Sequence, residues 1–174
     1  MAGLPDALLL YQRYSPHGCP CGYFADERNT CTCTPYQIAQ YRKRLSGPLL
    51  DRIDLHIEVR RLEYREIETQ QGAEPSGVVR HRVTEARERQ RRRLAPWGLS
   101  CNAEMSGYQV RECCSLTRGA RLLLRSAFNK LALSMRGHDR LLKVARTIAD
   151  LEGAEMIEEH HLAEALQYRS VWGG

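Results

Sequence analysis

The residues after position 75 constrain the fold most, because apolar side chains recur there at helical spacing almost to the end of the chain. The pattern is clearest after Ser134, with apolar residues at i, i+1, i+4, i+7 and i+8 counted from Leu141. Ser134 is of a type that caps the free amides at a helix start, and Gly153 is of the type that ends a helix. This stretch therefore predicts a long amphipathic helix within a helical domain.

Further helices are expected on both sides of it. A short helix is expected over 106–114, and Thr117 can cap the next one, which carries Leu124 and Ala127 on its apolar face. A last helix holds Leu162 and its apolar neighbours. These elements together predict a compact helical bundle.

The helix expected over 76–94 begins with Ser76 as its cap and is rich in arginine. Its inward residues are expected to be Val79, Val83 and Ala86. Arginines on the outside could bind a phosphate backbone. However, glutamates stand four positions before arginines in the pairs Glu85–Arg89 and Glu88–Arg92. That spacing favours a solvated or subunit-facing surface over a nucleic-acid surface.

The N-terminal third has a different pattern. Thr34-Pro35 predicts a helix start, and residues 53–59 alternate strictly between apolar and polar side chains, as a half-buried strand does. Residues 69–75 lie in a glycine- and proline-containing linker. We therefore expect a mainly α fold: a partial α/β segment with one clear strand over 1–68, the linker, and a helical bundle over 76–174.

Four of the seven cysteines lie within fifteen positions, in CPCGYFADERNTCTC (19–33). The start of the chain has no basic region and no clear cleavage site of a signal peptide, so we expect a cytoplasmic protein with reduced thiols. The pairs Cys19–Cys21 and Cys31–Cys33 then supply the four soft ligands that a structural Zn²⁺ requires. The alternatives are a partly occupied metal site and cysteines that only fill a tight loop.

The remaining cysteines and a histidine pair favour structural roles. Cys101, Cys113 and Cys114 have apolar neighbours at helical spacing, which is typical of small core residues. His160-His161 lies on an expected helix without a nearby cysteine, which favours a helix-face role over a metal site.

The charge pattern points to an anionic ligand. The formal net charge is +5, and almost all of the 26 basic residues are arginines, whose guanidinium groups hold phosphate oxygens in pairs. Arg52 stands in a rigid turn before the expected strand, and Arg136 stands in the first turn of the Ser134 helix, where free amides favour anions. Each could instead be a surface arginine or a member of an ion pair. No apolar run approaches the roughly 20 residues that a bilayer requires, so no membrane partner is expected.

Several sequence blocks, in this order, resemble a known family: CPCGY, CTCTP, RLSGPLLDRIDLHIEV (44–59), VRHRVTEARERQ, CNAEMSG, LALSMRGHDRLLKVARTIADLEG (131–153) and HLAEALQYR. Together they are similar to the C-terminal part of the magnesium-chelatase-like AAA+ ATPases of the ComM/YifB type. The resemblance covers about residues 19–170, and the SGPLLDRIDL and ARTIADL blocks are specific to the family.

This resemblance implies a fold, a function and residue roles. Residues 76–174 would be the AAA+ lid, and residues 1–68 part of the AAA+ core. Arg52 would be the trans arginine finger that acts on the ATP of a neighbouring subunit, and Arg136 would be the sensor-2 residue that touches nucleotide phosphate. The family implies ATP with Mg²⁺, a homo-hexamer of the full-length parent, and DNA remodelling such as helicase action or branch migration in natural transformation.

The chain also departs from the family pattern. It contains no G-x-x-x-x-G-K-[ST] and no apolar strand that ends in Asp-Glu, so the P-loop and the Mg²⁺-holding acid are both missing. His17-Gly18 occupy the places of the usual Asn-Pro, and residues 1–16 are expected to lie outside the family. We therefore expect a C-terminal fragment that hydrolyses no ATP by itself. A non-catalytic, zinc-containing helical module that binds DNA is the alternative.

Overall fold

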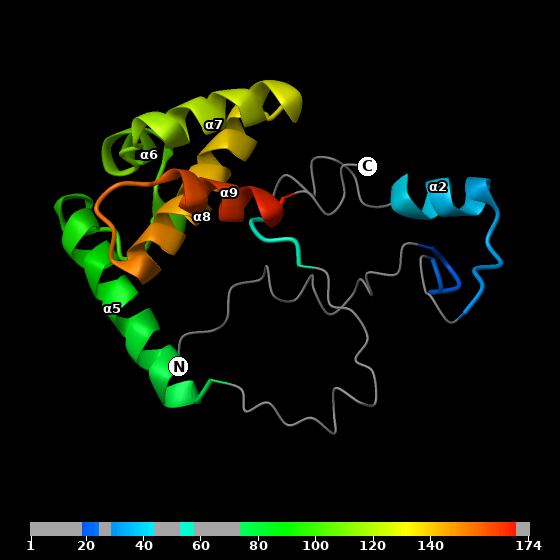
Figure 1. Ribbon diagram of the computed structural model, residues 1–174, viewed down its shortest axis with the longest axis horizontal. Coiled ribbons are helices and arrows are strands. Elements are labelled where there is room, and N and C mark those ends of the chain that lie inside the picture. Colours follow the sequence, from blue (N-terminus) through cyan, green and yellow to red (C-terminus); the bar gives the residue numbers. More distant parts are fainter. Residues whose placement is uncertain (1–18, 25–28, 44–52, 58–73, 170–174) are drawn as a thin grey trace. The chain divides into compact units, whose positions relative to one another are not determined.

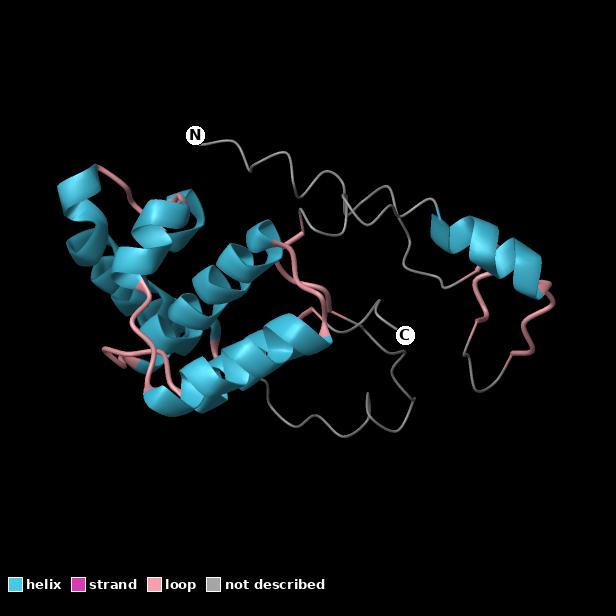
Figure 2. Cartoon of the chain, turned by 90° about the horizontal axis from the view of Figure 1, so that it is seen from above, coloured by secondary structure: helices cyan, strands magenta, loops and turns pink. Residues whose placement is uncertain are grey.

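The computed structural model describes residues 19–24, 29–43, 53–57 and 74–169. The chain divides after Ile53 into two compact units. In the described residues the regular elements are helices, with α2 (Pro35–Lys43) in the first unit and α5 to α9 in the second (Figures 1 and 2). The expectation of a mainly α fold with a C-terminal helical bundle is confirmed.

The second unit is built around α8 (Met135–Glu152), which packs against α5 (Ser76–Leu94), α6 (Gly107–Cys113) and α9 (Glu159–Gln167). In Figure 1, α9 lies across α8, and α7 (Arg118–Lys130) packs against α9. Two short 3-10 turns, η1 (Ala95–Trp97) and η2 (Asn102–Glu104), follow α5. A set of side chains with no exposed surface forms the core: Leu94, Val110, Leu141, Ala145, Ala149, Ile157 and Leu162.

The expected helix ends are present in the bundle. The Ser134 hydroxyl accepts a hydrogen bond from the Gly137 amide at 3.0 Å, and the Thr117 hydroxyl accepts one from the Ala120 amide at 3.3 Å. Gly153 ends α8 with a φ of 84°, a left-handed conformation that glycine adopts without strain. These caps fix where α7 and α8 begin, and therefore where Arg136 stands.

The N-terminal half of α5 differs from the expectation. Pro75, and not Ser76, occupies its cap position, and no side chain caps the helix. Val79 and Val83 are 36% and 46% exposed, so the prediction that they face inward is wrong. The buried residues are Ala86, Gln90 and Leu94. Among the described residues, α5 contacts α8 through its C-terminal half, where Arg89 and Arg93 donate hydrogen bonds to Asp150.

The structure also differs from the prediction of a strand over 53–59, within the residues that it describes. Residues 53–57 form no strand, and 58–59 lie outside the described residues. The His56 amide donates instead to the Tyr168 carbonyl at 2.8 Å. A strand needs an edge to pair with, and the bridge between Leu116 and Ile157 is the only β pairing in the described part of the chain.

No described helix is both long and apolar enough to span a bilayer.

Candidate functional site

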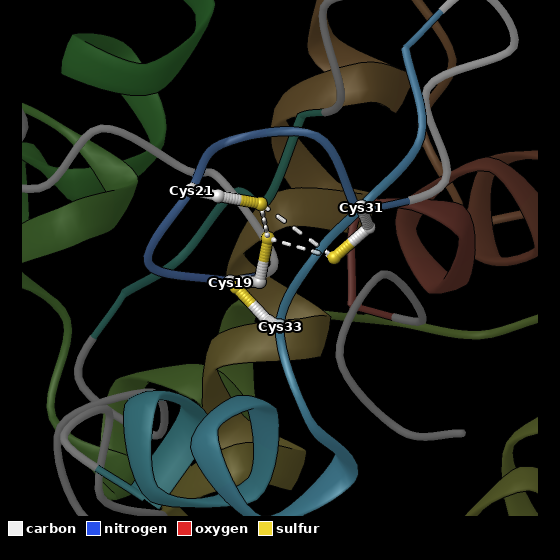
Figure 3. Close-up of side chains that lie close together, drawn as sticks. All are labelled: Cys19, Cys21, Cys31 and Cys33. Carbon is white, nitrogen blue, oxygen red and sulfur yellow. Dashed lines mark hydrogen bonds between the residues drawn. The ribbon is translucent and has the colours of Figure 1, made fainter.

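The first cysteine pair is held by a tight turn. The Gly22 amide donates to the Cys19 carbonyl at 3.2 Å, which closes the turn Cys19-Pro20-Cys21-Gly22. Proline at the second position favours this turn through its fixed φ, and Gly22 adopts a φ of 85°. The turn places the thiols of Cys19 and Cys21 together, as Figure 3 shows.

The second pair joins the first at close range. The Cys31 sulfur lies 3.6 Å from the sulfurs of both Cys19 and Cys21, which are themselves 3.3 Å apart. The Cys33 sulfur completes the group, since all four lie within 4.8 Å of one another. Cys33 directly precedes Thr34, whose hydroxyl accepts from the Gln37 amide at 3.3 Å at the start of α2. The structure therefore brings together the four cysteines that the sequence singles out.

The thiols of Cys21 and Cys33 differ in acidity. The pKa of Cys21 is lowered to about 6, first by a hydrogen bond with the Tyr23 backbone and then by one with the Cys19 thiol. The pKa of Cys33 is raised to about 12, because burial and the neighbouring thiols together outweigh a hydrogen bond with the Cys21 backbone that lowers it. A first thiolate raises the free energy of a second negative charge beside it.

The second predicted site lies at the start of α8. Arg136 is exposed in the first turn of α8, and it has no ion-pair partner among the described residues. It borders an open hollow of about 370 Å³, together with Arg140 and Lys143 one and two turns further along α8. Asp139 is the acidic residue that lines the same hollow. Asp139 and the Asp54 carboxylate beside Arg140 offset two of these three positive charges, so the hollow keeps a small net positive charge next to the helix N-terminus, which favours an anion.

An ion pair joins this end of α8 to the segment that follows Arg52. The Arg140 guanidinium lies 2.6 Å from the Asp54 carboxylate. Arg52 itself lies outside the described residues. The pair nevertheless holds a residue two positions after Arg52 one helical turn from Arg136. The sequence patterns did not indicate Asp54 or Arg140, because partners that are distant in sequence leave no periodic signal.

The arginines of α5 are mostly engaged within the chain. Arg92 pairs with Glu88 at 3.0 Å, and Arg89 lies 3.8 Å from Glu85, as their spacing predicted. Five of the seven arginines make ion pairs with described residues: Arg82, Arg89, Arg91, Arg92 and Arg93. The four exposed pairs, those of Arg82, Arg89, Arg91 and Arg92, support the solvated or subunit-facing interpretation of α5 over a phosphate-binding one.

A second cluster of possible metal ligands consists of Glu152, His160 and His161. The wholly buried His161 accepts the Glu158 amide at Nδ1, 2.9 Å away, so its proton lies on Nε2 and is donated to Glu152. A neutral histidine that binds metal through Nε2 carries its proton on Nδ1 instead. Hydrogen bonds from His160 and then His161 lower the pKa of Glu152. This geometry favours a helix-start role for the histidine pair.

The sequence patterns missed a buried charge network between α5 and α8. Asp150 is 1% exposed and accepts hydrogen bonds from Arg93, at 2.7 and 2.6 Å, and from Asn102, at 2.9 Å. The fully buried Arg146 lies 3.2 Å from Asp150 and donates to the Glu155 carbonyl at 2.7 Å. Arg93 was expected on the solvated face. One sequence signal could have indicated the network: Arg146 and Asp150 stand at i, i+4 spacing next to the apolar residues of α8.

The cysteines of the bundle largely follow the prediction. Cys113 and Cys114 are 8% and 4% exposed and belong to the core, while Cys101 is only partly buried. Burial raises the pKa of Cys114 to about 12, which keeps this thiol protonated.

Comparison with known sequences gives one family match for the helical bundle and one for the segment before it. The family "Magnesium chelatase, subunit ChlI C-terminal" matches residues 73–169, which contain the whole bundle from α5 to α9. The chain belongs to this family. The family "Magnesium chelatase, subunit ChlI" matches residues 13–67, which contain the cysteine loop and Arg52. The prediction that residues 1–16 lie outside the family is therefore wrong for 13–16.

Curated relatives of this magnesium chelatase family member include competence protein ComM of Haemophilus influenzae, 41% identical over 153 residues. YifB of Salmonella typhimurium is 41% identical over 154 residues, and YifB of Escherichia coli is 39% identical over 153. Each alignment covers 87% of this chain and 29% of the relative. The chain thus spans less than a third of the length of these relatives, and the ComM/YifB resemblance is confirmed.

Proposed function

We propose that this chain supplies the lid and the trans-acting arginine of an AAA+ ATPase that remodels DNA, as helicase or branch-migration enzymes do. The observation that carries the proposal is the position of Arg136. It stands exposed in the first turn of a capped helix, beside a hollow that Arg140 and Lys143 also line. The match to a competence protein supports a role in handling DNA during transformation.

In this proposal the chain acts on phosphate groups that another segment holds. Arg136 binds nucleotide phosphate, and its position on α8 transmits that contact to the bundle, because α8 packs against three other helices. The ion pair between Asp54 and Arg140 links the segment after Arg52 to the same helix. Nucleotide binding at the lid would thereby influence the position of Arg52 toward a neighbouring subunit. A homo-hexamer, ATP and Mg²⁺ belong to this proposal.

The alternative is a non-catalytic, zinc-containing helical module that binds DNA. It requires a free basic surface, and α5 carries the longest run of arginines in the chain. Since most of these arginines pair with glutamate or aspartate side chains, α5 supports this alternative less than the end of α8 supports a lid.

The 174-residue chain by itself is expected to show no ATP hydrolysis above background, because its sequence contains no P-loop to hold the reactants. Phosphate release is measured with Mg²⁺ and ATP over a range of protein concentrations. Turnover by the chain that Arg136→Ala abolishes would contradict the division of roles proposed here.

Arg136→Ala is the direct test of the lid. The variant is examined in an assembly that joins this chain to the P-loop segment that the family implies. Loss of one charged contact to phosphate is expected to lower kcat/KM for ATP about 10- to 100-fold, a loss of roughly 1.5–3 kcal/mol. The unfolding midpoint should stay unchanged, since the side chain is exposed.

Arg118→Ala is the matched control. Arg118 is also an exposed arginine in the first turn of a capped helix, α7, but it does not line the hollow at the start of α8. It should leave kcat/KM within about twofold of the unmodified assembly, as surface substitutions generally do. Equal effects of the two substitutions would remove the support for Arg136.

A further inference from the structure

The cysteine loop at 19–33 has no part in the lid proposed above. We propose that Cys19, Cys21, Cys31 and Cys33 bind one structural zinc ion through their four sulfur atoms. The inference rests on the geometry of the sulfurs and on the scarcity of other buried side chains among the described residues between 19 and 43. It is independent of the proposed ATPase role.

The sulfur positions match a tetrahedral site. With Zn–S bonds of about 2.3 Å, the sulfurs of a regular tetrahedron lie about 3.8 Å apart. The three measured separations among Cys19, Cys21 and Cys31 are 3.3, 3.6 and 3.6 Å. Cys33 lies within 4.8 Å of the other sulfurs. Small movements of side chains are therefore enough to close the four thiolates around one ion.

The same separations argue against other roles of four cysteines. A disulfide requires sulfurs about 2.05 Å apart, and all seven cysteines of the chain are free thiols. An iron–sulfur cluster places two or more irons and bridging sulfides between its ligands, which a group this tight does not accommodate. Loop-filling cysteines would contact apolar side chains, whereas the sulfurs of Cys19, Cys21 and Cys31 lie within 3.6 Å of one another (Figure 3).

The surrounding segment needs such a cross-link. Among the described side chains of residues 19–24, 29–41 and 43, Cys19 is the only one in the buried class. The exposed aromatic residues Tyr23, Phe24 and Tyr36 do not form a core. A segment with so little buried apolar surface is ordinarily held by a metal or by disulfides. Zinc would tie the turn at Cys19–Gly22 to the residues just before α2.

The ion would be structural and not catalytic. Four protein thiolates fill the tetrahedral coordination of zinc and leave no position for water or substrate. Because the site cannot form in the unfolded segment, the free energy of zinc binding would stabilise the loop and the start of α2 directly. Loss of zinc should therefore affect this segment and leave the helical bundle intact.

The test uses the whole chain, purified in reducing buffer, and measures metal by mass spectrometry. We expect about one zinc ion per chain, and less than about 0.1 per chain in Cys31→Ser/Cys33→Ser. Cys101→Ser is the control, because this partly exposed cysteine lies outside the group and should keep the zinc. Chelation should make four additional thiols reactive toward a thiol reagent, and cobalt(II) should give the visible spectrum of a tetrahedral thiolate site.

A second measurement keeps the test decisive if the double variant is poorly folded. Helical circular dichroism and the unfolding midpoint of the bundle should be the same with and without zinc, while amide signals of 19–43 change. A well-folded chain with no zinc and no chelator-sensitive thiols would overturn the proposal. Stoichiometric iron in place of zinc would overturn it as well.

Discussion

Arg52→Ala is expected to lower ATP hydrolysis about a thousandfold in an assembly that contains both this chain and a P-loop, while ATP binding changes by less than about twofold. In the proposed role, the guanidinium neutralises charge that develops on the transferred phosphoryl group in the neighbouring subunit. That interaction exists mainly in the transition state, so its loss lowers kcat and not affinity. Hydrolysis is measured by phosphate release and binding by a fluorescent nucleotide.

The role in trans gives a sharper test. Subunits with Arg52→Ala keep an intact P-loop, and subunits with an inactive P-loop keep Arg52. Mixing the two inactive proteins should restore part of the activity, because some interfaces then combine a working P-loop with a working arginine. Arg118→Ala subunits, which retain both, serve as the positive control. A mixture as inactive as its components would count against action across subunits.

The Asp54–Arg140 pair gives a reason why Arg52 and Arg136 should be coupled. Asp54 is two residues after Arg52, Arg140 is four residues after Arg136, and the charged atoms of Asp54 and Arg140 are 2.6 Å apart. Asp54 is 53% exposed, so the pair adds little to the stability of the fold. Its consequence is positional: in this structure it places Asp54, two residues after Arg52, beside Arg140 of α8.

Much of the bundle could be predicted from the sequence, because its signals are local. Ser134 and Thr117 cap the helices that follow them, and Gly153 ends α8 at the position expected for it. Local hydrogen bonds determine these features, so a short stretch of sequence contains all the required information. The position of Arg136 was predictable for the same reason.

Features that depend on distant partners were not predictable in this way. Val79 and Val83 follow the inward pattern of a helix, but the N-terminal half of α5 meets no described surface that covers them. The alternation over 53–59 has a strand's period, yet pairing depends on an edge that another segment must supply. The cysteine pairs were predictable in part. Their spacing indicates four possible metal ligands, but only the fold of the loop brings the four sulfurs within 4.8 Å of one another.

Asp150→Asn is expected to destabilise the bundle by about 3–5 kcal/mol, because it leaves the buried Arg146 guanidinium and the half-buried Arg93 guanidinium without their counter-charge. Asp150 is 1% exposed, Arg146 is 1% exposed and Arg93 is 24% exposed. Water therefore replaces little of the lost interaction. The substitution also removes one acceptor from the fork in which Arg93 binds both carboxylate oxygens. The free energy of unfolding is measured by urea denaturation followed by circular dichroism.

Glu88→Gln is the matched control, since it neutralises a carboxylate that also binds an arginine of α5. Glu88 is 47% exposed and its partner Arg92 is 78% exposed, so this pair contributes at most about 1 kcal/mol. The difference between the two losses in the free energy of unfolding then measures how much burial strengthens an arginine–carboxylate pair. If Asp150→Asn cost no more than Glu88→Gln, the network would not be what holds α5 against α8. The apolar contacts of Leu94 and Ala86 would then have to account for that packing.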